Sequence, residues 1–281
     1  MTAMEPVTQE LARATEEFNR RALEMGLGDL HNYYWYHTIE LPGGLVTPGA
    51  YDFRRSLPCF RFPEDMSGQR VLDVGSATGF FAFEFEKRGA KVVSVELPSL
   101  AALDRFPGQT VERSIQKIQR MLAPFAERKN LTARELYFYL LAGPFEFCRK
   151  LLRSRVERCL STVYELSAAG LGSFDLVFMG DILVHTLNPP QALAAVAPLA
   201  KATLVLSQVM PDTADARPAM LYVGGEDPLE DDLSWWWPNQ ACLCQLLRKL
   251  GFREVVAVGH HTGVLRSSGY VYDRAILHAI R

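Results

Sequence analysis

The sequence predicts an α/β protein built on a doubly wound sheet, and three observations support this fold class. Residues 70–96 run from a short apolar strand through a glycine turn and an apolar helix to a second apolar strand, which is a βαβ unit. Strand and helix patterns then alternate through the second half of the chain. The 281 residues are 48% hydrophobic and 22% charged, which suits one large globular domain with accessory elements.

Residues 1–60 are predicted to form an N-terminal helix and an aromatic lid segment ahead of the sheet. Residues 8–25 have the apolar spacing of an amphipathic helix, which Gly26 and Gly28 end. Residues 31–49 then read HNYYWYHTIELPGGLVTPG, an aromatic run followed by a loop. Because neighbouring aromatic side chains cannot all face one core, we expect some to cover the helix and others to line a cleft.

The later elements follow the same alternation. Further strands are predicted near Val163 and at 174–179, 204–207, 254–258 and 270–280. Helices are predicted at 190–199 and from a cap at Asn239 to Leu250.

An insertion at about 101–155 has helical patterns at 111–128 and 133–141. Residues 111–158 hold eleven Lys or Arg and five Glu, a charge of +6, whereas residues 209–233 hold seven Asp or Glu and one Arg, a charge of −6. Such runs are usually solvated faces, and these two could also pair.

The most specific motif is VLDVGSATGFF at residues 71–81, in which a strand ends in Asp-x-Gly-x-x-x-Gly and a helix opens at once. Glycine lets the backbone turn tightly and approach a ligand, and the helix start offers free N–H groups. The spacing differs from the GxGxxG of dinucleotide-binding proteins. One βα unit later the strand VVSVE ends at Glu96, whose carboxylate can accept both hydroxyls of a ribose. Another nucleotide-binding α/β protein, or a chance turn, is the alternative.

Together these residues resemble motif I and the following acidic position of class I S-adenosylmethionine-dependent methyltransferases, which have a Rossmann-like, doubly wound, seven-stranded sheet. The resemblance implies S-adenosyl-L-methionine as cofactor and S-adenosyl-L-homocysteine as product, with no metal. It assigns residues 61–281 to the methyltransferase domain. The cofactor-binding positions that it implies are Asp73, Gly75, Ser76, Gly79, Phe80, Glu96, Leu97, Tyr164, Glu165, Met179, Gly180 and Asp181.

The match narrows to one group within that family. The segments FDLVFMGDILVHTLNPPQAL, LVLSQ, WWWPNQACLCQLLRKLGF and SGYVYDRAILHAI are similar to the tRNA wobble-uridine carboxymethyltransferases and their uncharacterised bacterial relatives. The similarity covers residues 68–100 and 155–281 and is weak across 101–150. Those tRNA enzymes hold a carboxylated cofactor with a lysine, a tyrosine and an arginine. Here Arg274 matches the arginine, but Val184 stands at the tyrosine position and residues 38–68 contain no lysine.

The missing partners favour the ordinary cofactor. An unpaired carboxylate in a partly buried site costs several kcal/mol, so we expect S-adenosylmethionine and simple methyl transfer. Arg274 then either contacts the substrate or pairs with an acid of the sheet or of the cofactor's surroundings.

Two histidines are candidates for catalysis. Methyl transfer needs a general base only if the acceptor is protonated, and histidine is the natural one. His185 follows motif IV, and His37 lies in the aromatic segment. The alternatives are that His185 braces the following loop and that His37 is a packing residue. His260 and His261 are adjacent on a predicted strand and point to opposite faces, which argues against a shared metal.

The candidate substrate contacts are Trp35, Tyr36, Trp236 and Arg274, because aromatic walls suit a planar or apolar acceptor and attract a sulfonium. Packing of the N-terminal helix is the alternative for about half of the aromatic residues.

The first hypothesis is therefore a methyltransferase for a small, aromatic or apolar acceptor. The alternatives are a tRNA-modifying enzyme that docks RNA on the basic insertion and a non-catalytic cofactor-binding protein. The net charge of −2 gives no global basic field, no apolar run reaches a membrane span, and the N-terminus lacks a signal core. Five irregularly spaced cysteines suit a reduced cytoplasm. The oligomeric state stays open.

Overall fold

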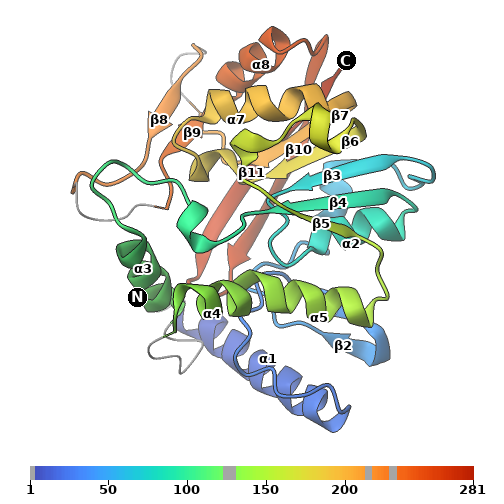
Figure 1. The fold of residues 1–281 in the computed structure, drawn as a ribbon, viewed down its shortest axis with the longest axis vertical. Coiled ribbons are helices and arrows are strands. Elements are labelled where there is room, and N and C mark those ends of the chain that lie inside the picture. Colours follow the sequence, from blue (N-terminus) through green and yellow to red (C-terminus); the bar gives the residue numbers. More distant parts are fainter. Residues whose placement is uncertain (1–3, 123–130, 213–216, 228–232) are drawn as a thin grey trace.

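The predicted fold class is confirmed by a seven-stranded sheet in the computed structural model, which describes residues 4–122, 131–212, 217–227 and 233–281. The strand order is β10-β11-β7-β6-β3-β4-β5 (Figure 1). The five strands from β7 to β5 are parallel, and β11 runs antiparallel between β7 and β10. Their bounds are β3 Arg70–Val74, β4 Lys91–Glu96, β5 Glu157–Leu160, β6 Phe174–Gly180, β7 Ala200–Gln208, β10 Glu254–Leu265 and β11 Tyr270–Ile280.

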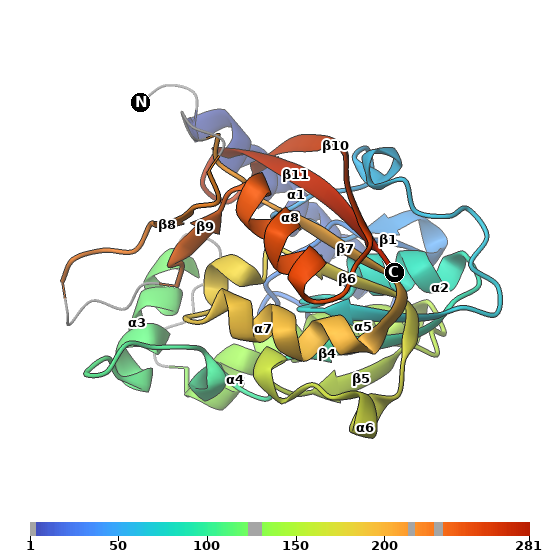
Figure 2. The same ribbon diagram turned by 90° about the horizontal axis from the view of Figure 1, so that it is seen from above.

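Helices cover both faces of the sheet (Figures 1 and 2). One face carries α7 (Pro189–Val196) and α8 (Gln240–Lys249), whose leucines pack on Leu72, Val177 and Leu204. The other face carries α2 (Phe80–Lys87) and, beyond it, α1 (Met4–Glu24) and α5 (Gly143–Leu151). Each face has its own buried cluster, because strands with apolar side chains on both sides need cover on both.

The insertion forms a helical layer next to α1. It contains α3 (Val111–Leu122) and α4 (Ala133–Tyr137), and α4 continues through a π-helical turn into α5. Thr132 and Glu135 cap α4 reciprocally. The predicted helix at 111–128 is seen to Leu122, and its last residues, like much of the acidic stretch at 209–233, lie outside the described residues. The remaining elements are β1 Glu40–Leu41, β2 Leu45–Val46, α6 Ala168–Leu171, β8 Met220–Tyr222 and β9 Trp236–Pro238.

The strand predicted near Val163 was wrong by several residues. The edge strand is β5, which pairs Glu157 with Val93 and Leu160 with Glu96, whereas Val163–Glu165 is a short 3-10 helix. Because β5 is only half-buried, it carries no apolar run. The apolar residues that follow it line a cavity, as described below, and their pattern therefore imitates a strand.

The aromatic segment folds back on the loop that follows it. Thr38 N–H donates to Tyr51 O at 2.8 Å, and Tyr51 N–H donates to Tyr36 O at 2.9 Å. Gly49 is needed at this crossing, since a Cβ there would lie 2.0 Å from the Thr38 nitrogen.

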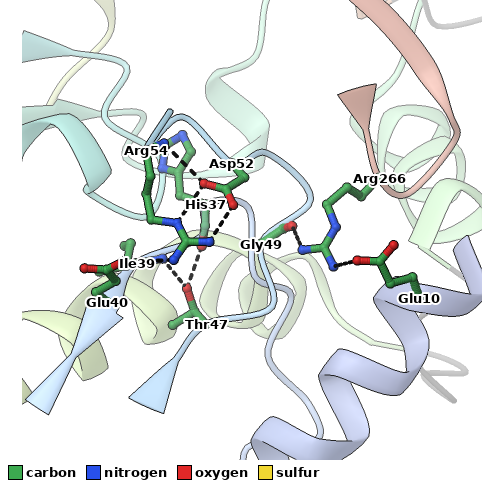
Figure 3. A network of polar contacts seen from close by, with 9 residues as sticks. All are labelled: Glu10, His37, Ile39, Glu40, Thr47, Gly49, Asp52, Arg54 and Arg266. Carbon is green, nitrogen blue, oxygen red and sulfur yellow. Dashed lines mark hydrogen bonds and ion pairs between the residues drawn. The ribbon is translucent and has the colours of Figure 1, made fainter. Parts of the chain in front are cut away.

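A polar network fixes this fold of the segment (Figure 3). Thr47 Oγ1 donates to His37 O and accepts from Ile39 N–H, both at 2.7 Å. Arg266, on the β10–β11 turn, donates to Gly49 O at 3.1 Å and lies 3.7 Å from Glu10 of α1. The network thus joins the aromatic segment, α1 and the β10–β11 hairpin.

Candidate active site

Two adjoining cavities lie where the parallel strands β3, β4 and β6 end. The larger, of about 280 Å³, extends along the ends of β3 and β4 under the insertion. The smaller, of about 80 Å³, lies between the motif I turn, the end of β6 and the aromatic segment. They share Tyr36, Gly75, Ala77, Ile182 and His185. Ligands of doubly wound proteins bind at this edge of the sheet. A groove of about 1100 Å³ lies instead beside Arg70 and Lys91, at the opposite ends of β3 and β4.

The motif I turn brings a buried carboxyl group to the smaller cavity. Asp73 is 2% exposed, and Oδ2 has no hydrogen-bond partner within the described part of the chain. Burial raises the pKa of Asp73 to about 7, against the opposing effects of Ser76 and Arg158. Gly75 follows at φ +75, and a Cβ there would lie 1.8 Å from Ile182 Cδ1. An unsatisfied acid beside a turn that has no room for a side chain at position 75 fits the polar end of an amino acid.

Glu96 ends β4 in the larger cavity. Its Oε2 accepts Ala77 N–H at 2.8 Å and its Oε1 accepts Leu97 N–H at 2.9 Å. Each oxygen keeps further acceptor capacity, because a carboxylate oxygen has two lone pairs. Arg158, on β5, lies 3.9 Å from Glu96, and it also donates to Ala77 O at 3.0 Å. A buried acid held in this way fits the two hydroxyls of a ribose.

An apolar and aromatic wall completes the larger cavity. Val163 and Tyr164 line it after β5, and the Tyr164 hydroxyl donates to Asp104. Burial and Asp104 raise the pKa of Tyr164 to about 12. Trp235, 1% exposed, forms the far side together with Leu233. This wall suits a planar adenine.

The structure separates the predicted cofactor residues into two groups. Eight of them line a cavity: Asp73, Gly75, Ser76, Glu96, Leu97, Tyr164, Gly180 and Asp181. Gly79, Phe80, Glu165 and Met179 line neither cavity. Glu165 is exposed and accepts from Thr162 Oγ1 at 2.8 Å, and Met179 packs in the core under α7 and α8.

The predicted substrate residues also separate. Tyr36 lines both cavities, whereas Trp35, Trp236 and Arg274 line neither. Trp35 is 3% exposed and packs on Phe18 of α1 with ring centroids 4.9 Å apart. Trp236 Nε1 donates to Leu187 O at 3.2 Å. Trp35 thus packs on the N-terminal helix, as the packing alternative states, whereas Trp236 contacts Leu187 and not that helix.

The side chain of Arg274, on β11, is paired with an acidic side chain, as one of the two alternatives for this residue states. It forms an ion pair with Asp181, which follows β6 and lines the smaller cavity, and its guanidinium carbon lies 4.3 Å from the centre of the Tyr272 ring. Burial raises the pKa of Asp181, and the Arg274 charge opposes this. The pair is therefore internally neutralised.

Both predicted histidines reach the smaller cavity. His37 is 5% exposed, burial lowers its pKa to about 3, and Nδ1 has no partner among the described residues. Its backbone N–H donates to Thr78 Oγ1 at 3.2 Å, which ties the aromatic segment to motif I. The His185 ring is hydrogen-bonded through Nδ1 to Leu233 O, so it contacts the segment before the tryptophan run and not the loop that follows His185.

Several residues at the cavities were missed in the sequence. Ser207 and His261 come from strands far apart in the chain, and Arg158 lies on a short edge strand. Only Trp235 carries a sequence signal, because it belongs to the tryptophan run 235–237. The prediction from the sequence names its neighbour Trp236 instead. The aromatic side chains of the smaller cavity are Tyr36, Tyr51, Phe53, Phe60, Phe81 and Phe178.

The sheet order, the motif I turn at the end of β3 and the acid at the end of β4 define a class I S-adenosylmethionine-dependent methyltransferase. The chain belongs to the methyltransferase domain family, which it matches over residues 51–258. S-adenosyl-L-methionine is the cofactor of this class.

Comparison with known proteins finds one short stretch of similar sequence and structures of the same fold. A stretch of 59 residues is 42% identical to magnesium-protoporphyrin O-methyltransferase of Rhodobacter capsulatus and covers 20% of this chain but only 26% of that protein. The N-terminal domain of EvdMO1 with S-adenosylhomocysteine bound is similar over 95% of this chain and 97% of that one, with 19% identity and a TM-score of 0.55. Full EvdMO1 gives 19% identity and a TM-score of 0.52 over 94% of this chain and 47% of that one. At this identity the likeness concerns the fold.

Two kinds of feature are absent from the described residues. None of their helices is long and apolar enough to cross a bilayer. Nor do they contain three or more His, Cys, Asp or Glu side chains grouped to hold a metal ion.

Proposed function

We propose that this protein transfers the methyl group of S-adenosylmethionine to a small acceptor with an aromatic or apolar body, bound in the smaller cavity. The observation that carries this proposal is the junction of the two cavities. A space lined by Phe53, Phe81 and Phe178 meets the cofactor cavity at Tyr36, Gly75 and His185. An aromatic ring stacked among these side chains would bury apolar area, which is the main favourable term in binding such a molecule.

The cofactor residues have separate roles in this proposal. Asp73 and Ser76 hold the amino-acid end, Glu96 holds the ribose, and Leu97 and Tyr164 lie against the adenine. When bound, the cofactor supplies a methyl group on a positively charged sulfur, which is already a strong electrophile. The protein contributes position and the exclusion of water. Tyr36, on the boundary of the cavities, can also attract the positive charge through its ring.

We further propose that residues 1–60 act as a lid on the methyltransferase domain, residues 61–281, together with the insertion at about 101–155. The two covering parts touch each other. Tyr34 N–H donates to Tyr139 O at 2.9 Å, and the rings of Tyr33 and Phe138 lie 5.9 Å apart. Tyr36 therefore sits on a segment that is held by the insertion on one side and by motif I on the other.

Alanine at Tyr36 or His37 is expected to lower kcat/KM for the acceptor by about tenfold to a hundredfold. Each substitution removes a wall of the acceptor cavity, and the loss of one ring contact or one buried hydrogen bond costs about 1–3 kcal/mol. Cofactor affinity should stay within a few-fold of the wild-type value. Steady-state kinetics and calorimetry measure the two quantities. Tyr34→Ala is the matched control, since Tyr34 lines neither cavity. Unchanged kinetics in both variants would reduce the segment to a packing element.

The proposed acceptor class is tested by mass spectrometry of ligands that co-purify, followed by assays of S-adenosylhomocysteine formation with small aromatic compounds. Unmodified tRNA is the comparison. RNA binding that weakens steeply with salt, together with tRNA methylation, would instead support the tRNA-modifying alternative.

A carboxylated cofactor would contradict the proposal directly, and Arg274 argues against such a cofactor because Asp181 already neutralises that arginine. A failure to bind S-adenosylmethionine in calorimetry would support the non-catalytic alternative.

A further inference from the structure

Ser207 and His261 form an isolated polar pair on an otherwise aromatic wall. Ser207 Oγ lies 3.0 Å from His261 Nε2, and both residues are 3% exposed and line the smaller cavity. They stand on β7 and β10, which are separated in the sheet by β11. Phe53 and Phe60 flank the His261 ring, with centroids 5.7 Å and 4.8 Å away. The pair therefore lies beneath Phe53 and Phe60, two residues of the loop that follows the aromatic segment.

The pair is incomplete without a ligand. His261 Nδ1 is buried and, among the described residues, has no hydrogen-bond partner. The same is true of His37 Nδ1 and Asp73 Oδ2, which belong to residues lining the same cavity. Buried polar atoms are nearly always paired, and leaving them unpaired costs free energy. Ser76 Oγ in this cavity is also without a partner among the described residues. With Asp73 and Ser76 assigned to the cofactor, the two imidazoles remain for the acceptor.

The charges around the cavity point to a neutral polar group on the acceptor. Asp181 is paired with Arg274, so the pair offers a substituent no net charge. Arg274 Nη1 has no hydrogen-bond partner among the described residues, but Arg274 lines neither cavity. Burial lowers the pKa of His261 to about 4 and that of His37 to about 3, so both rings are uncharged at neutral pH. A carboxylate or an ammonium group would enter this cavity without a counter-charge, which is costly. A hydroxyl group can donate to an imidazole nitrogen at no such cost.

We propose, building on the function proposed above, that the acceptor is an alcohol or phenol and that His261 takes the proton from its hydroxyl group, with Ser207 as a positioning residue. In this arrangement Nε2–H donates to Ser207 Oγ, which leaves Nδ1 as the proton acceptor. The hydroxyl oxygen forms its bond to the methyl carbon while the carbon–sulfur bond breaks with its electron pair on sulfur, and the O–H proton passes to Nδ1. Water removes that proton after the product leaves.

A weakly basic imidazole is sufficient for this step. The oxygen becomes strongly acidic as it gains the methyl group, because a protonated ether is a far stronger acid than imidazolium. The ring is the active base when uncharged, so kcat/KM should be constant above about pH 5 and should fall as the pH drops through 4. The titratable and charged groups around His261 are His260 on β10, Tyr272, Asp273 and Arg274 on β11, and Asp181 after β6.

The first test measures binding without turnover. Phenol is titrated into the complex with S-adenosylhomocysteine, in wild type and in the His261→Ala and Ser207→Ala variants. We expect at least about tenfold weaker phenol binding in His261→Ala, with the affinity for S-adenosylhomocysteine unchanged. His260→Ala is the matched control, since that ring lies on the same strand, is exposed and pairs with Asp273 at 3.1 Å. Benzoate and benzylamine serve as charged comparisons. No phenol binding, or tighter binding of benzoate than of phenol, would overturn this inference. If S-adenosylhomocysteine still binds in that case, the proposed methyl transfer stands.

The second test separates a catalytic role from a structural one. With a phenol that wild type methylates, His261→Gln should lose about 10²–10⁴ in kcat, the usual contribution of a general base. Its remaining rate should rise with pH as the phenol ionises, whereas the wild-type rate stays level. Ser207→Thr should retain more activity than Ser207→Ala because it keeps the hydroxyl. A uniform loss with the wild-type pH profile would overturn the proton-transfer role.

Discussion

Glu96→Ala is expected to weaken S-adenosylmethionine binding by at least about a hundredfold, which corresponds to roughly 2.7 kcal/mol. The carboxylate is the group placed to accept two ribose hydroxyls, and hydrogen bonds to a charged group contribute about 1.5–3 kcal/mol each. Removing it also leaves Ala77 N–H and Leu97 N–H without their acceptor and takes away the negative charge nearest Arg158. Isothermal titration calorimetry measures the change directly.

Glu165→Ala is the matched control for this variant. Glu165 is the other acidic residue predicted at the cofactor, yet it is exposed and caps the turn that begins at Thr162. Its removal should leave cofactor affinity within threefold of wild type. Glu96→Gln keeps the shape and removes the charge, so it should fall between wild type and Glu96→Ala if folding is preserved. Equal affinities for all three variants would refute the ribose assignment.

Gly75→Ala is expected to lower the free energy of unfolding by about 1–2 kcal/mol, which is the cost of a side chain on a residue in the left-handed backbone region. It should also weaken cofactor binding by at least about tenfold. The new Cβ would lie 1.8 Å from Ile182 Cδ1, and Ile182 lines both cavities. Ile182 must therefore move, and the space that it can move into is the space that the ligands need. Thermal unfolding and calorimetry report the two effects.

Gly68→Ala separates backbone strain from the blocked cavity. Gly68 has φ +78, close to that of Gly75, but a Cβ there meets nothing within 4 Å. It should lose similar stability and bind cofactor normally. Adding Ile182→Ala to Gly75→Ala should restore part of the affinity. If Gly75→Ala binds like Gly68→Ala, the turn is not against the cofactor.

Local signals are sufficient to predict eight positions that line the two cavities. The Asp-x-Gly-x-x-x-Gly turn, the acid at Glu96 and the residues after β6 are each set by a strand end, and strand ends are readable from short apolar runs. Because parallel strands bring their carboxyl ends to one edge, these positions had to converge. Four predicted positions nevertheless line neither cavity, since a neighbour in sequence can face the opposite side of a strand or turn.

The aromatic lining of the smaller cavity depends on tertiary packing. The run Tyr33–Tyr36 predicted a mixture of packing and binding roles, but the rings that took each role emerged only when α1, the insertion and motif I packed around them. The tryptophan run behaved in the same way, with Trp235 at the cavity and Trp236 outside it.

Strand periodicity and one local turn are enough to predict the fold class, the cofactor and the edge of the sheet at which the two cavities lie. Two contacts could be seen in the folded chain alone: the ion pair of Arg274 with Asp181, and the contact of Ser207 with His261 beneath Phe53 and Phe60. Both contacts join residues more than fifty positions apart across different strands. No local pattern encodes such a distance, since it follows from strand order and from the face of the sheet that each side chain takes.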